Sequence, residues 1–523
     1  MKHFIKGLVA ATTFASAIAT GAIAADEPKK GGTLLTVLGS NPRNLNPAVQ
    51  SGIVTGFPGA QLFASPLRYD DDWTPQPYLA ESWEVSEDGL KVTLNLVKNA
   101  KFHDGHPITS SDVAFSLKVI QEKHPFKSMF APVESVDTPD DHTAVLNLSR
   151  PHPALMLAMS GQLMAIIPEH IYGDGQDPKA HPRNNADVVG SGPFKLTEFV
   201  SGEHVILERF DDFFIDGRPY LDKIVMRIIT DPAARAIALE NGELDFAAFE
   251  SLPRIINRLK KVDHLTVTPK GYGAIGPLDW LAINTTKGPL ADKRVRQAIA
   301  YAVDRKFIMN ALMQGTASEA NTGIHPDSPY YESDVNPYDV DLDKANALLD
   351  EAGFAKKDDG TRFGVTIDFG WPGVKPQVEY VKAALKKVGI DVTVRASADF
   401  PTWAKRMGTM DFDLSWDTVF NWGDPVIGVH RTYLTDNIAK GVWSNTQGYS
   451  NARVDELLAA AAVERDPAKR TALYSEFQKI VNDEVPLVYT NTLPYHTVYS
   501  SKVGNPPLGI WGTSTPLDKM YLK

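Results

Sequence analysis

The sequence predicts a large α/β protein whose chain passes repeatedly between lobes. Short segments with the period-two alternation of half-buried strands are interleaved with longer segments of helical periodicity along the chain. A length of 523 residues exceeds what one hydrophobic core usually organises, so two or more domains are expected. The 38 glycines and 36 prolines are spread along the chain without a low-complexity linker, which favours interleaved lobes over domains joined in series.

The first residues have the pattern of a secretory signal peptide, which we place at residues 1–25. Two lysines form a basic start, a short apolar stretch follows, and Ala22-Ile23-Ala24 has the small-residue spacing of a cleavage site. Cleavage is expected after Ala24 or Ala25. The apolar stretch is too short and too rich in Thr, Ser and Gly for a membrane anchor. The chain has no cysteine, so we expect no lipid anchor and predict a free protein of the periplasm.

The charge and composition exclude several classes of protein. The formal net charge is −11, and removal of the two leader lysines would make it −13, so the basic surface that nucleic acid requires is not expected. No later segment has about 18 uninterrupted apolar residues, so no membrane-spanning helix is expected. A mature chain of this size can bury large cores without disulfides, which agrees with the absence of cysteine.

Strands and helices have distinct signals. Alternating patterns predict strands at Val92–Leu96, Thr143–Leu148 and Val205–Leu207. A helix is expected after Asp231, which suits the N-cap position and precedes a proline at the first helical position. Gly242 suits the left-handed residue just after the end of this helix.

Further helices are predicted in the second half of the chain. In the stretch DKRVRQAIAYAVDR, apolar residues lie on one helical face at Val295, Ile299, Ala302 and Val303. Gly353 follows the next helical pattern in the same C-terminal role as Gly242. Two consecutive helices are expected at Asp455–Val463 and Pro467–Ile480.

The stretch FHDGHPITSSDV contains two histidines, His103 and His106, around an Asp-Gly pair, which raises the question of a metal site. Asp104-Gly105 is a turn signal, and Thr109 followed by Asp112 is close to a capping box. The segment therefore predicts a strand, a tight turn and a capped helix. Two histidines in a turn have no third ligand nearby in the sequence, and zinc usually takes three or four, so we predict no metal site.

The same stretch resembles the signature F-x-D-G-x-P-[IL]-T-[AS]-x-D-V of the periplasmic peptide/opine/nickel-binding family, the solute receptors of ABC importers. Other motifs of this family follow in order along nearly the whole mature chain. They are Lys30–Leu34, Leu79–Trp83, Gly190–Phe194, Asn241–Asp245, Asn284–Thr286, Val295–Ala298, Tyr449–Asn451, Val454-Asp455 and Pro486.

This resemblance implies a two-lobed periplasmic binding protein fold of type II, cluster C, with an extra subdomain in the first lobe. By analogy, residues 26–66, 193–279 and 497–523 form the core of lobe 1. Residues 67–192 form the extra subdomain and residues 280–496 form lobe 2. Lobes of this family close over a small-molecule ligand and dock on permease subunits of an ABC importer in the inner membrane. The resemblance implies a monomer without catalytic residues, cofactor or metal.

The segment DFDLSWDTVFNWGDPVIGV resembles the part of the second lobe that faces the ligand. In peptide-binding relatives an aspartate four residues before its proline pairs with the ligand amine, and that position here is Asn421. An amide cannot replace the charge-assisted bond of a carboxylate, which argues against simple peptides unless Asp417 compensates. Trp416 and Trp422 offer aromatic faces to sugar C–H groups, and Asp424 is a further candidate contact.

Other candidate contacts come from the same comparison with the family. Dipeptide-binding relatives carry an arginine near the start of a later helix, where this chain has Lys375, with Trp371 close by. A lysine at a helix N-terminus suits an anion. The remaining candidates lie after the first strand and near the expected hinge and tail crossings: Gly39, Ser40, Asn41, Tyr272, Trp280 and Trp511.

Together these features favour a receptor for a sugar-derived amino acid, an opine-like molecule or an oligosaccharide. An oligopeptide receptor is the alternative, and a nickel-chelate receptor is weaker, although His430 follows the loop of interest. An exported hydrolase is disfavoured because the chain has neither a G-x-S-x-G nucleophile elbow nor an H-E-x-x-H zinc motif.

Overall fold

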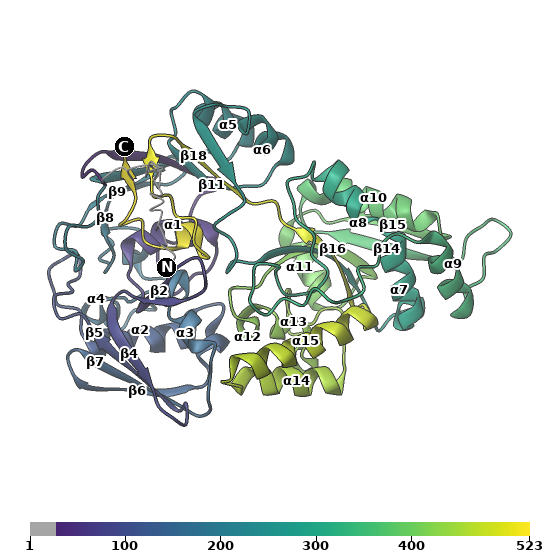
Figure 1. Ribbon diagram of the computed structural model, residues 1–523, viewed down its shortest axis with the longest axis horizontal. Helices are drawn as coiled ribbons and strands as arrows, with labels where there is room; N and C mark the ends of the chain where they lie inside the picture. Colours follow the sequence, from purple (N-terminus) through teal and green to yellow (C-terminus); the bar gives the residue numbers. More distant parts are fainter. Residues whose placement is uncertain (1–27) are drawn as a thin grey trace, which may run out of the picture.

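The computed structural model describes residues 28–523 and shows two lobes joined by crossing segments (Figure 1). The predicted leader, residues 1–25, lies outside the described residues. Sheets and helices alternate through both lobes, which confirms the α/β class. Within residues 28–523, no helix is both long and apolar enough to cross a membrane.

The first lobe is built on a seven-stranded mixed sheet. Its strands lie in the order β12 (Leu265–Thr268), β18 (His496–Ser500), β11 (Phe246–Glu250), β1 (Thr33–Leu38), β10 (Lys223–Ile228), β9 (His204–Arg209) and β8 (Phe194–Val200). Strand β1 pairs in parallel with β10 and β11, whereas the outer strands pair antiparallel. Its main helices are α1 (Ile53–Leu62), α5 (Pro232–Glu240) and α6 (Pro253–Leu259).

An extra subdomain lies beside this sheet and is formed by a four-stranded antiparallel sheet with short helices (Figure 1). The strand order is β4 (Ala80–Val85), β5 (Lys91–Leu96), β7 (Thr143–Leu148) and β6 (Val133–Asp140). A small β2–β3 pair and three helices complete it: β2 (Leu67–Tyr69), β3 (Pro75–Pro77), α2 (Ser110–Lys123), α3 (Leu155–Ala158) and α4 (Glu169–Tyr172). The strands predicted at 92–96, 143–148 and 205–207 are confirmed as parts of β5, β7 and β9.

The second lobe has a five-stranded sheet with helices on both faces. Its strand order is β15 (Ile390–Ala396), β14 (Phe363–Phe369), β16 (Leu414–Phe420), β13 (Pro277–Ile283) and β17 (Leu487–Thr492). One apolar cluster takes residues from α7 (Lys293–Ala302), α9 (Leu342–Glu351) and α10 (Lys375–Lys386). The other takes residues from α11 (Phe400–Gly408), α14 (Ala452–Val463) and α15 (Pro467–Glu484). Short helices connect these elements: α8 (Arg305–Phe307), α12 (Pro425–Gly428) and α13 (His430–Tyr433).

Helix ends follow the capping chemistry that the sequence predicts. The Asp231 carboxylate accepts a hydrogen bond from Ala234 N, and Gly242 has a φ of 71°, a left-handed value that suits glycine. At α2, the Thr109 backbone N–H donates to Asp112 Oδ2 at 2.9 Å, which confirms the predicted turn and capped helix. Helix α14 begins three residues before the predicted Asp455, because Asn451 caps it by accepting from the next backbone N–H groups.

Two segments connect the lobe sheets, and they lie side by side. Strand β12 leads into β13 through residues 269–276, and β17 leads into β18 through residues 493–495. Leu493 N donates to Pro277 O at 3.1 Å, so the second crossing is hydrogen-bonded to the start of β13, where the first crossing ends. The predicted domain limits at 279/280 and 496/497 fall inside β13 and β18, and the full division of the chain stays a prediction.

Candidate ligand-binding cleft

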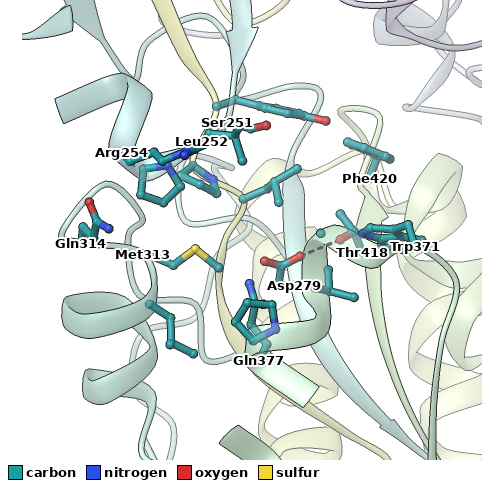
Figure 2. A pocket seen from close by; sticks show the side chains of 18 of the residues that line it. Ser251, Leu252, Arg254, Asp279, Met313, Gln314, Trp371, Gln377, Thr418 and Phe420 are labelled. Carbon is teal, nitrogen blue, oxygen red and sulfur yellow. Dashed lines mark hydrogen bonds between the residues drawn. The ribbon is translucent and has the colours of Figure 1, made fainter. Parts of the chain in front are cut away.

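A cavity of about 530 Å³ lies where the lobes meet the crossing segments (Figure 2). From lobe 1 it is lined by residues 251–254, at the start of α6, and from lobe 2 by β13, β16 and the start of α10. A second cavity of about 310 Å³ lies under β1 and α1 in lobe 1. Ser251 and Tyr495 line both cavities, so the two cavities adjoin.

Aromatic side chains form much of the wall of the larger cavity. Trp371 lies edge-on to the buried Trp403, with ring centroids 5.6 Å apart. Trp443 Nε1 donates to Asp417 at 3.2 Å, which fixes the orientation of that indole. Phe420 and Tyr495 have nearly parallel rings at 6.4 Å. Flat apolar faces of this kind suit the C–H faces of a sugar or the apolar parts of a ligand.

Asp279 places a buried carboxylate in the cavity wall (Figure 2). Its carboxylate accepts from Thr418 Oγ1 at 2.6 Å and from Asn491 Nδ2 at 3.1 Å. Burial raises the pKa of this carboxyl to about 6, and the two hydrogen bonds lower it only in part. Within residues 28–523, no lysine, arginine or histidine forms an ion pair with Asp279, so its charge is uncompensated at neutral pH.

Two further polar groups line the same cavity. Arg254 lies at the second position of α6 and is exposed, and no residue of the described chain forms an ion pair with it. Gln377, near the start of α10, is buried, and its Oε1 has no hydrogen-bond partner in the part of the chain that the structure describes. A buried acceptor without a partner is costly, so Gln377 Oε1 is suited to a donor on a ligand.

The smaller cavity has a neutral polar wall. Gly39 and Ser40, both predicted contacts, line it. Beneath them Arg235 forms a buried bidentate pair with Glu250 at 2.5 and 3.1 Å, so neither charge is left unpaired. The predicted contact Asn41 is outside both cavity walls, because its side chain bonds Ser201 Oγ at 3.0 Å and Gly202 N at 2.8 Å.

The predicted second-lobe loop contributes less to the cavity than the sequence indicates. Asn421 accepts from His325 N at 2.7 Å and donates to Gly323 O at 3.0 Å, so its amide holds two backbone segments together outside the cavity wall. Asp424 forms a buried pair with Arg470 at 2.7 Å and also lies outside the wall.

The two tryptophans of that loop also lie outside the cavity wall. Trp416 is fully buried in the core of lobe 2. Trp422 is 4% exposed and packs at 5.3 Å against Phe126 of the extra subdomain. Arg431 of α13 also covers the Phe126 ring, at 5.2 Å, so Trp422 and α13 both contact the first lobe.

The buried Asp417 does not line the cavity directly. It accepts from Thr418 N at 2.6 Å and from Trp443 Nε1 at 3.2 Å, and burial raises its pKa to about 8. Lys375 is exposed, whereas its neighbours Val374 and Pro376 line the cavity. Trp371 is thus the predicted second-lobe residue that the structure places in the cavity wall.

The three remaining candidates, Tyr272, Trp280 and Trp511, line neither cavity and make packing or hydrogen-bond contacts elsewhere. The Tyr272 hydroxyl accepts from Phe249 N at 2.9 Å and bonds Thr497 Oγ1 at 2.8 Å. Trp280 is buried against Tyr489, with centroids 5.7 Å apart. Trp511 is buried, and its Nε1 donates to Ser160 Oγ at 3.0 Å.

Several cavity residues were not predicted from the sequence, namely Asp279, Arg254, Gln377, Trp443 and Tyr495. One of them has a readable signal: Asp279 is the only charged residue in the otherwise apolar run of β13, and every residue of that strand is buried. A lone acid in a buried strand is costly without a cation, which makes it a candidate functional group. The others are brought to the cavity only by tertiary structure.

The fold and the cleft define a two-lobed solute-binding protein. The family described as "Bacterial extracellular solute-binding proteins, family 5 Middle" matches residues 74–440. A relative from Brucella ovis, named as an ABC transporter peptide-binding protein, is 30% identical over 88% of this chain and 87% of its own length. The chain therefore belongs to the family 5 bacterial extracellular solute-binding proteins.

Solved structures agree with this assignment. NikA from Brucella suis, in complex with Fe(III)-EDTA, is 26% identical with a TM-score of 0.82, over 94% of this chain and 100% of that chain. AgaA from A. tumefaciens R10, in complex with agropinic acid, is 25% identical with a TM-score of 0.77, over 94% and 99%. The chain is a solute receptor of an ABC importer that works with permease components, and the comparisons indicate no catalytic family.

Proposed function

We propose that this receptor captures a small zwitterionic ligand, a sugar-derived amino acid or opine-like molecule, between its lobes and delivers it to an ABC importer. The observation that carries this proposal is the carboxylate of Asp279, which is buried in the cavity wall without a cation. A ligand ammonium would supply the missing charge through a charge-assisted hydrogen bond. A neutral oligosaccharide, the other ligand that the aromatic wall suits, would leave this charge uncompensated.

The remaining groups of the cavity fit the other parts of such a ligand. Arg254 offers guanidinium donors to a ligand carboxylate from the opposite lobe. Gln377 Oε1 can accept from a hydroxyl or amide N–H. Trp371 and Trp443 provide aromatic faces for a sugar ring. The volume of about 530 Å³ lies within the range of small-molecule sites, which favours one compact ligand over a long extended chain.

Ligand capture would follow from closure of the lobes. Asp279 belongs to lobe 2 and Arg254 to lobe 1, so both ends of a zwitterion are held together only when the lobes approach. The ligand would then stabilise the closed state by its difference in affinity for the two states. Contacts remote from the cavity would support closure, among them Trp422 on Phe126 and Arg465 on the carbonyl of Ser86.

We further propose that the mature protein acts as a free monomer in the periplasm, after cleavage of residues 1–25 near Ala24 or Ala25. The support is the leader pattern in the sequence together with membership of a family of extracellular solute-binding proteins.

An oligopeptide is the second candidate ligand. The relative from Brucella ovis is named as peptide-binding, and a peptide has the same ammonium and carboxylate as an opine-like molecule. Asp279 would then bind the peptide amine, the role of the aspartate that peptide-binding relatives carry at the position of Asn421. Nickel chelates are a weaker candidate, because His430 is buried and bonds Tyr474, away from the cavity.

Calorimetric titration of the mature protein, stripped of ligand by partial unfolding and refolding, would test the proposal. The panel would hold sugar–amino acid conjugates, di- to pentapeptides, neutral oligosaccharides and nickel chelates. Micromolar or tighter binding of a conjugate, lost when its amine is acetylated, is the expected result. Binding of peptides alone would favour the second candidate. Equal binding of neutral oligosaccharides would refute the role of Asp279, while the receptor assignment would remain.

A further inference from the structure

A cluster of metal-ligating side chains lies on the extra subdomain, outside both cavity walls. Asp104 and His106 belong to the turn between β5 and α2, and His170 belongs to α4, which is distant in sequence. No third ligand is near this turn in the sequence, which argues against a metal there, but the fold brings His170 to it. We propose that Asp104, His106 and His170 bind a divalent transition-metal ion of the zinc, nickel and copper class.

The three side chains already converge on one point. His170 Nε2 lies 2.8 Å from Asp104 Oδ2, and His106 Nδ1 lies 3.2 Å from Asp104 Oδ1. The two imidazole rings are 4.1 Å apart between centroids, and one ligand atom from each of the three residues lies within 4.8 Å of the others. An ion between them would replace the proton in each of the two imidazole–carboxylate contacts with a coordinate bond. Among residues 28–523, this is the one such group of three.

The backbone around the cluster is well fixed. Gly105 has a φ of 93°, which tightens the turn, and His106 N donates to Asp104 Oδ1 at 3.2 Å. Helix α4 is tied to α2, because Glu169 N donates to Asp112 Oδ1 at 3.0 Å. The ring of His170 also lies edge-on to the buried Phe102 at 5.7 Å. Asp104 and His170 are therefore held in place by contacts that do not depend on the metal, which reduces the ordering cost of metal binding.

His103, the other histidine of the motif, is not a ligand. Its Nδ1 accepts from Gly190 N at 3.0 Å and its Nε2 contacts Gly192 O at 3.0 Å, so both ring nitrogens are used. In the family signature, His103 and His106 occupy variable positions, whereas Asp104 is part of the shared motif.

The donor set selects the class of ion. Two imidazoles and one carboxylate suit Zn²⁺, Ni²⁺ and Cu²⁺, whereas Mg²⁺ and Ca²⁺ prefer oxygen ligands. No lysine or arginine among the described residues forms an ion pair with Asp104, so its carboxylate is available to a cation. Three protein ligands leave one or more positions for water. His106 is 61% exposed in its side chain, so an ion could enter from solvent without any opening of the fold.

Equilibrium titration with ZnCl₂ and NiCl₂, on mature protein without a histidine tag and after EDTA treatment, would test the site. One saturable site is expected, with no response to MgCl₂. His106→Ala and His170→Ala should each weaken binding at least about tenfold. Bound Co²⁺ or Cu²⁺ should give a visible absorption band that reports imidazole ligation. His204→Ala is the matched control, because His204 pairs with Glu198 at 3.2 Å without a second imidazole.

The outcomes separate this proposal from the ligand cleft. Both cluster variants should retain the thermal unfolding midpoint and the organic-ligand affinity of the unmodified protein. Because the His106 side chain is exposed, its replacement by alanine should not disturb folding. Unchanged metal affinity in both variants would place the ion elsewhere and overturn the proposal. Failure of the unmodified protein to bind zinc at millimolar concentration would also overturn it, and neither result would affect the proposed function of the cleft.

Discussion

Replacement of Asp279 by asparagine should make the ligand-free protein more stable while it weakens the binding of an amine-bearing ligand. Burial raises the pKa of this carboxyl from 3.8 to about 6. Each pKa unit corresponds to about 1.4 kcal/mol, so the ionised carboxylate costs the folded protein about 3 kcal/mol at neutral pH. The asparagine amide can donate to Thr418 Oγ1 while its oxygen accepts from Asn491 Nδ2, so both present neighbours keep a partner.

The pH dependence distinguishes a charge effect from a packing effect. The folded state holds the Asp279 proton more tightly than the unfolded state, so the cost is small near pH 4 and grows as the pH rises towards 6. Above that pH the carboxyl is ionised in both states and the cost is constant. The gap in unfolding free energy between Asp279→Asn and the unmodified protein should therefore widen by about 2 kcal/mol between pH 4 and pH 7.5.

Urea unfolding of both ligand-free proteins at several pH values would measure this gap. Calorimetry at pH 7.5 should show that the variant loses about 10- to 100-fold in affinity for an amine-bearing ligand. A ligand analogue with an acetylated amine serves as the control, since both proteins should bind it equally weakly. A stability gap that is the same at every pH, or an unchanged affinity, would refute the reasoning.

Three further predictions concern residues of both lobes. Arg254→Ala should lower affinity for carboxylate ligands by about tenfold or more in calorimetry. Arg258→Ala on the same helix should not, because Arg258 is paired with Glu240. Equal losses would contradict a direct contact between Arg254 and the ligand carboxylate. Trp422→Ala should weaken all ligands by a similar factor and shift the ligand-free protein towards an open form in small-angle scattering, because it removes a lobe–lobe contact; a ligand-specific loss would instead make Trp422 a direct contact. Asn421→Asp should destabilise the protein by about 1–3 kcal/mol in urea unfolding, because it removes the donor to Gly323 O, and it should give no gain in peptide binding.

The elements of the fold could be predicted because their signals are local. Asp231 and Gly242 mark the limits of α5 through caps and a left-handed residue that act within one turn of the chain. The motif order along the chain then indicated the two-lobed family. The predicted start of α14, at Asp455, is too late because the prediction followed the apolar pattern. That pattern begins only after the polar first turn of the helix, which Asn451 caps.

The cleft was harder to predict because its residues come together only in the tertiary structure. Alignment to a relative's loop led to Asn421, but an asparagine amide has two donors and an acceptor, and here Gly323 and His325 use them. Trp422 was expected on a ligand for its aromatic face, and the structure uses that face between the lobes. The cluster of His106 and His170 was missed for the same reason, since nothing local brings α4 to the turn.

The position of Asp279 suits the proposed link between ligand charge and lobe closure. Its two hydrogen-bond donors, Thr418 and Asn491, are its register partners on the strands at either side, so the carboxylate is held in a rigid sheet. Arg254, in contrast, reaches the cavity from a helix of the other lobe. On the proposed function, a zwitterion that met Asp279 first would remain half-paired until lobe 1 approached with Arg254. The second charge of such a ligand would contribute its energy mainly in the closed state, and that difference would allow binding to drive closure.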